Sequence, residues 1–219
     1  MRGRLFVVGV SLIASFGCVL VAALPPAVGQ AYSGSVERGL LVAAQARGTW
    51  IVACLAFAVA MVLLLIGLAT LSSVLRAQVP ESAVPDVALA LITVGTVLWV
   101  AAQTFRLTTM LRVADLFAAT RAVPDWYPPL RFWADDGLLN AMTFTAGPAV
   151  VLYGTIVARR GVLAPWTGWL AVALAVLTMA EYFLINGVIP ATLHLAVVFM
   201  GADAVVRAYR LATPSRAAG

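Results

Sequence analysis

The chain has no lysine, a single histidine (His194) and only two cysteines (Cys18 and Cys54), and each scarcity excludes a kind of site. One histidine excludes a bis-histidine haem and a histidine-rich zinc site. Both thiols lie inside apolar runs, which indicates packing residues and not a disulfide framework or a metal site. The sequence contains no glycine-rich phosphate loop, nucleophile elbow or Cys-x-x-Cys motif. We therefore expect no cofactor and no bound metal.

The sequence consists mainly of long apolar runs. Hydrophobic residues make up 63% of the 219 residues, and the mean hydropathy is +1.02. A helix needs about 20 mostly apolar residues to cross the hydrocarbon of a bilayer, and its backbone groups must bond within the helix. This predicts an all-α, polytopic transmembrane bundle of six spans that forms a single domain over 1–219. We place the spans near 5–24, 50–75, 87–111, 138–158, 166–185 and 189–206.

Charge sets the predicted orientation. All 14 basic side chains are arginine, and they gather at the ends of apolar runs, which is typical of topology signals and not of nucleic-acid binding. The first run is longer than the apolar region of a signal peptide, so we interpret it as a retained span. The arginines close to short connections favour both termini in the cytoplasm. The arginine-rich, lysine-free composition is typical of a bacterial protein, and we expect the bacterial inner (plasma) membrane.

A long outside connection is predicted between spans three and four, over Arg106–Asp136. Apolar residues recur there at helical spacing, from Leu107 to Phe117, and predict an amphipathic extension of the third span. The proline- and aromatic-rich segment 124–133 follows, which fits either an aromatic belt at headgroup level or a stiff lid over a cavity. The first outside connection is expected to hold a short surface helix near 40–46.

Polar side chains inside spans are unfavourable in hydrocarbon, so their depth is informative. Spans three to six all carry theirs toward the predicted outer ends, with Asp136, Asn140 and Thr143 spaced to share one helix face. This predicts an outer-half polar cavity lined partly by aromatic rings. The candidate ligand-binding residues are Arg106, Gln103, Asn140, Tyr182, Trp99, Trp133 and Phe144, with Phe105 and Phe183 as further lining.

Glu181 is the most informative single residue, because a carboxylate at its depth must be protonated or paired. Arg106 and His194 are its expected partners by depth, and an interhelical ion pair, a ligand site and proton transfer all stay open for it. If the protein is an enzyme, Glu181, Asp136 and His194 are the candidate catalytic residues. Asp203 and Arg207 are expected to pair one helical turn apart.

One segment resembles a known group of proteins. Gly147-Pro148, Arg159-Arg160 and the run Gly161–Leu170, with Trp166 and Trp169, are similar to features of small six-helix bacterial integral membrane proteins of unknown function. The resemblance covers residues 138–183 and implies a helical membrane fold without an activity to transfer.

Three functions remain open on the sequence. The first is binding or translocation of a small or amphiphilic ligand from the lipid bilayer, with a homo-oligomer or a partner membrane subunit completing the assembly. The second is an intramembrane enzyme (a cyclase, isomerase or lyase) that uses a carboxylic acid on a lipid or isoprenoid. The third is an accessory subunit of a membrane complex.

Overall fold

The computed structural model describes residues 1–32, 35–185 and 190–212, and these residues are helical apart from short connections. The helices are α1 (Arg2–Ala23), α2 (Pro26–Tyr32), α3 (Val36–Gln45), α4 (Arg47–Arg76), α5 (Val84–Phe105), α6 (Leu111–Thr120), α7 (Tyr127–Phe132), α8 (Leu138–Arg160), α9 (Pro165–Ile185) and α10 (Pro190–Arg210), with two π-helical turns, η1 (Arg106–Met110) and η2 (Trp133–Gly137). Six of the helical stretches in the described residues are long and apolar enough to cross a membrane. Asn186 and Ile189, the predicted first residue of the sixth span, lie outside the described residues.

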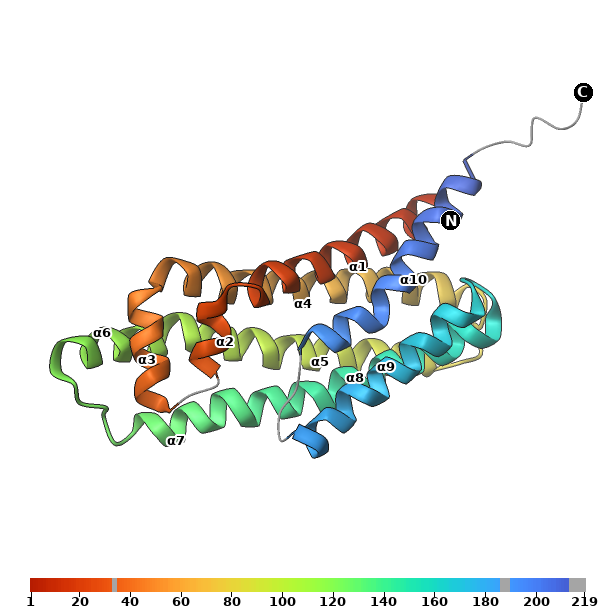
Figure 1. The fold of residues 1–219 in the computed structure, drawn as a ribbon. Coiled ribbons are helices and arrows are strands. Elements are labelled where there is room, and N and C mark those ends of the chain that lie inside the picture. The colour runs from red at the N-terminus through yellow and green to blue at the C-terminus, as the bar shows by residue number, and fades with distance from the viewer. Residues whose placement is uncertain (33–34, 186–189, 213–219) are drawn as a thin grey trace, which may run out of the picture.

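The long helices form a closed ring in chain order (Figure 1). Helix α1 packs on α4, α4 on α5, α5 on α8, α8 on α9 and α9 on α10, and α10 returns to α1. Leucine, alanine and valine side chains fill the contacts between them, with Leu12, Leu64 and Val150 fully buried. Because lipid does not drive apolar helices together, close packing and interhelical hydrogen bonds must hold such a ring.

Hydrogen bonds between helices supply part of that specificity. The indole N–H of Trp99 on α5 donates to the Phe57 carbonyl on α4, at 2.8 Å. The Ser72 hydroxyl on α4 and the Tyr153 hydroxyl on α8 are 2.6 Å apart. In hydrocarbon each of these groups has no water as an alternative partner, so the bonds favour one arrangement of the helices.

The two ends of the bundle differ. Helices α2, α3 and α6 gather at one end (left in Figure 1), which we name the capped end, whereas the N-terminus and the end of α10 lie at the other, the terminal end. Helix α3, where the sequence predicts a short surface helix, packs against α6 through buried Leu40 and Ala43 and exposes Glu37, Arg38 and Gln45. Arg47 and Asp115 join α4 to α6 at 2.5 Å on the exposed side.

The predicted connection between spans three and four is itself helical. Helix α5 continues through η1 and α6 to Thr120, and a new helical stretch begins at Tyr127 and runs through η2 into α8, so only residues 121–126 connect them. The predicted extension of the third span is thus confirmed. The fourth predicted span, 138–158, corresponds to α8, and the helical stretch that contains α8 reaches back to Tyr127.

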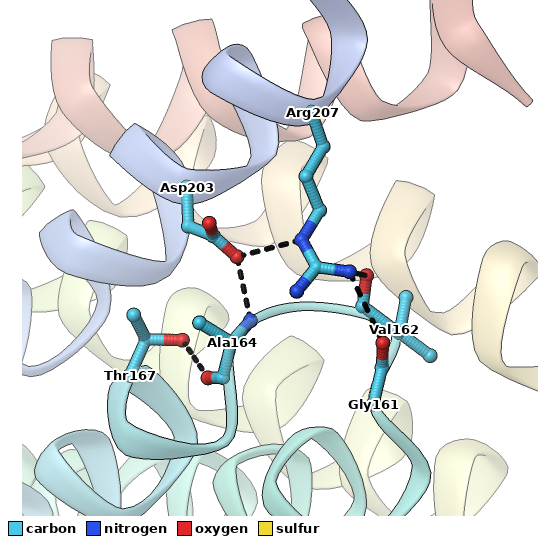
Figure 2. A network of polar contacts seen from close by, with 6 residues as sticks. All are labelled: Gly161, Val162, Ala164, Thr167, Asp203 and Arg207. Atoms are coloured by element: carbon cyan, nitrogen blue, oxygen red, sulfur yellow. Dashed lines mark hydrogen bonds and ion pairs between the residues drawn. The ribbon is translucent and has the colours of Figure 1, made fainter. Parts of the chain in front are cut away.

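At the terminal end, α10 holds the turn between α8 and α9 (Figure 2). Arg207 donates to the carbonyls of Gly161 (3.1 Å) and Val162 (3.0 Å), just past the end of α8. Asp203 accepts from the backbone N–H of Ala164 at 2.6 Å, just before α9 begins, and from Arg207 at 3.0 Å. A cation at a helix C-terminus and an anion at a helix N-terminus both complement the helix dipoles. The predicted Asp203–Arg207 pair is confirmed.

Helices α8 and α9 approach closely at Gly154 and Gly168. A methyl group on Gly168 would lie 2.4 Å from the Gly154 carbonyl oxygen and 2.6 Å from the Ala158 nitrogen, both backbone atoms. We predict that Gly168→Ala lowers the free energy of unfolding by about 1–3 kcal/mol, because the helices must separate. Gly17→Ala is the matched control, because no atom lies within 4 Å of the added methyl. Thermal unfolding in detergent checks the pair, and equal melting temperatures for both variants would contradict this packing.

Candidate functional site

A buried ion-pair cluster joins α5 to α8 at the capped end. Arg106 Nε lies 2.8 Å from Asp135 Oδ1, and Arg131 Nε lies 3.2 Å from Asp135 Oδ2. The exposed fractions of these side chains are 3% for Arg106, 14% for Asp135 and 13% for Arg131. The guanidinium of Arg131 also donates to the Ala31 carbonyl of α2, at 3.4 Å. The Asp135 carboxylate therefore pairs with two arginines, and Arg131 connects this pair to α2 at the capped end.

Both partners of the buried pair lie in π-helical turns. Arg106 opens η1 and Asp135 lies within η2. A π turn is rare and adds a residue to the helical repeat, which redirects the side chains beside it, and such turns are frequent at functional sites. In η1 the Thr108 hydroxyl donates to the Thr104 carbonyl at 2.7 Å, a side-chain bond that competes with the regular backbone pattern. The two turns bring side chains 29 residues apart into contact.

Aromatic rings surround the ion pair. The Arg106 guanidinium carbon lies 6.0 Å from the centroid of the Trp99 ring, within range of a cation–π interaction. Trp99 meets Phe57 edge to face, and Tyr127 stacks on Phe105 with ring centroids 6.3 Å apart. Tyr127 is fully buried and lies close enough to Arg106, Arg131 and Asp135 to interact with their charges. The surroundings of the arginine are thus apolar, which strengthens its attraction to Asp135.

Two buried side chains beside the cluster have unpartnered polar atoms. Gln103 lies one turn before Arg106 on α5, is 1% exposed, and neither atom of its carboxamide makes a hydrogen bond in the structure. The hydroxyl of Tyr127, with its side chain 0% exposed, also has no partner. Because most buried polar groups in proteins are hydrogen-bonded, such atoms point to something that binds there.

A groove of about 470 Å³ opens the cluster to the surface. Its lining residues are Ser35, Val36, Pro128, Arg131, Phe132, Asp135 and Asp136. Asp136 is exposed and makes no hydrogen bond or ion pair among the described side chains. Phe132 and Trp133 are 69% and 58% exposed, which suits rings at a membrane–water interface. The groove thus combines both signs of charge with an apolar margin.

The other sequence-predicted residues make different contacts. Glu181 accepts a hydrogen bond from the Thr192 hydroxyl at 2.7 Å, a contact that the sequence did not indicate. His194 is 1% exposed, and its Nδ1 lies 2.7 Å from the Ser15 hydroxyl, which donates to the Ala60 carbonyl. These bonds join α10 to α9 and to α1, and they join α1 to α4. The catalytic roles suggested for Glu181, Asp136 and His194 stay predictions.

Two groups of predicted site residues differ in their surroundings. Asp136 is exposed, Asn140 half-buried and Thr143 fully buried, although the sequence predicts that they share one helix face. The π turn η2 adds a residue before α8 and breaks the 3.6-residue spacing on which that expectation rests. Phe144 and Phe183 are 39% and 75% exposed and form an outward-facing group with Tyr182, whose ring is 5.6 Å from Phe144. They therefore do not line an enclosed cavity.

Sequence reasoning missed the two residues that complete the cluster. Neither Arg131 nor Asp135 is among the predicted site residues, although their spacing of four residues indicates a possible pair. Trp99, Gln103 and Arg106 follow one another at helical spacing, and all three are buried on α5 and η1.

Comparison with known proteins adds no relative. No protein-family model, curated protein or solved structure matches the chain. The resemblance of residues 138–183 to small six-helix bacterial membrane proteins therefore stays a prediction.

We predict that Asp135→Asn destabilises the protein by roughly 3–5 kcal/mol, because it leaves the buried guanidinium of Arg106 without a counter-charge. Asp125→Asn is the control, since Asp125 is an exposed carboxylate in the connection 121–126. Unfolding of both variants in mixed micelles checks the difference. Wild-type stability for Asp135→Asn would show that Asp135 does not neutralise the arginine.

Proposed function

We propose that this chain is a multi-pass membrane protein that binds an amphiphile with a zwitterionic headgroup in the groove beside the Arg106–Asp135 pair. The observation that carries the proposal is the presence of Arg131 and Asp136 in one groove, each with unused hydrogen-bonding capacity. A headgroup with an anionic oxygen and an ammonium group complements both.

The arginine supplies the anion contact. Arg131 uses Nε for Asp135 and Nη2 for the Ala31 carbonyl, and no hydrogen bond from Nη1 is found among the described residues. A guanidinium is a planar fork that suits phosphate and carboxylate oxygens. Gly39 on α3 lies beside this side chain, since a methyl group there would be in ordinary contact with Nη1, at 3.4 Å.

The second carboxylate supplies the cation contact. Asp135 is neutralised by two arginines, whereas the neighbouring Asp136 is exposed in the same groove. An ammonium group there would form a charge-assisted hydrogen bond. The volume of about 470 Å³ falls in the ordinary range of small-molecule pockets, and exposed Phe132 beside it offers contact to an acyl chain.

The proposed membrane and orientation rest on the amino-acid sequence. We propose a bacterial cell membrane with both termini in the cytoplasm, which places the capped end and its groove on the outer side. Arg159, Arg160, Arg207 and Arg210 at the terminal end support this orientation, since cytoplasmic ends of spans are enriched in arginine.

We predict that Asp136→Asn weakens binding of phosphatidylethanolamine about tenfold, which corresponds to about 1.4 kcal/mol for one charge-assisted contact. Binding is measured by native mass spectrometry of detergent-solubilised protein with added lipid. Phosphatidylglycerol, which has the phosphate without the amine, should bind the variant and the wild type alike.

Asp125→Asn serves as the matched control for the loss of one exposed carboxylate at this end of the bundle. It should keep the wild-type preference for the amine-bearing lipid. If Asp136→Asn and Asp125→Asn both retain that preference, the groove does not recognise a zwitterion and the proposal fails.

A further inference from the structure

We infer that the buried carboxamide of Gln103 is a second binding site, for a small uncharged molecule that both donates and accepts hydrogen bonds. Gln103 does not line the groove, and the inference does not depend on the function proposed for the groove. The site lies on the face of α5 that carries Trp99, one turn before Arg106.

The first argument is the burial of unpartnered polar atoms. The Gln103 carboxamide offers two donors and an acceptor oxygen, is 1% exposed, and has no partner for either atom. In a helix that crosses a membrane, solvent outside the protein cannot satisfy these atoms, and polar groups at such depth face an interior site or a water-filled cavity. An apolar residue at position 103 would leave no buried polar atom without a hydrogen bond, yet the chain has glutamine here.

The second argument is the surroundings of the amide on α5. Trp99 lies one turn before Gln103 and Arg106 one turn after it, and the Arg106 guanidinium reaches back to 6.0 Å from the Trp99 ring centroid. The Trp99 N–H is occupied by the Phe57 carbonyl, at 2.8 Å. These contacts fix the side chains on both sides of Gln103, as expected for a built site with positioned walls.

The third argument concerns the charge of the guest. Arg106 and Asp135 already neutralise each other at 2.8 Å, so a further ion beside Gln103 would be buried without a counter-charge. A neutral group with a donor and an acceptor matches the carboxamide, which itself both donates and accepts. Water is the smallest such molecule, and a hydroxyl or amide group of an amphiphile has the same chemistry.

The test is the sign of the stability change in Gln103→Met, a replacement of similar volume that removes both polar atoms. No residue forms a hydrogen bond with the carboxamide. If no guest binds it either, its removal should give the variant a higher melting temperature than the wild type. A bound guest predicts a lower one, by about 2–4 °C, since its hydrogen bonds are lost. Gln103→Leu should show the same sign, and Gln45→Met, at an exposed glutamine, should change nothing.

Radiolytic hydroxyl labelling then identifies the source of the guest. Wild-type protein in detergent without added lipid is irradiated, and modification of buried Trp99 and Tyr127 is read by mass spectrometry. If the wild type is labelled and Gln103→Met is not, the guest is water. If Gln103→Met is destabilised but the wild type is not labelled, the guest is a larger molecule that excludes water. A melting temperature at or above that of the wild type for both Gln103→Met and Gln103→Leu would overturn the inference, and phosphatidylethanolamine binding by these variants reports on the groove independently.

Discussion

The neutralisation of Arg106 is the constraint on which the capped end depends. A guanidinium cannot lose its charge under ordinary conditions, and at 3% exposure it needs an anion within contact distance. Asp135 is that anion, and bringing it there requires α5 and α8 to meet at one depth. The two π-helical turns contain the paired residues, aromatic rings surround the pair, and Arg131 attaches α2 to it.

Charged side chains form hydrogen bonds at both ends of the bundle, but with different partners. At the terminal end, Asp203 and Arg207 bond the backbone groups that the ends of α8 and α9 leave unsatisfied. At the capped end, the charges bond each other and a groove lies beside them. The first arrangement satisfies its hydrogen bonds internally and fixes a turn. The second leaves Gln103, Tyr127 and Asp136 with unused capacity, which is why binding is proposed there.

Composition and periodicity predicted the spans well and the site only in part. Uninterrupted apolar runs locate α1 and α4 to within a few residues, because length and hydropathy alone define a spanning helix. Depth along the third span likewise placed Trp99, Gln103 and Arg106 together. The pairing of Arg106 with Asp135 joins two helices and depends on π turns, and a regular 3.6-residue repeat cannot reveal either. The partners of Glu181 and His194 depend on how neighbouring helices rotate, which local spacing does not determine.

A double-mutant cycle on the central pair tests this account most directly. The free energy of unfolding is measured in mixed micelles for the wild type, Arg106→Met, Asp135→Leu and the variant with both changes. The account predicts that the double variant is more stable than the sum of the single effects implies, with a coupling of about 1–3 kcal/mol, because neither charge is then left buried alone. Additive effects would contradict it, since they would mean that Arg106 and Asp135 are not partners in the folded protein.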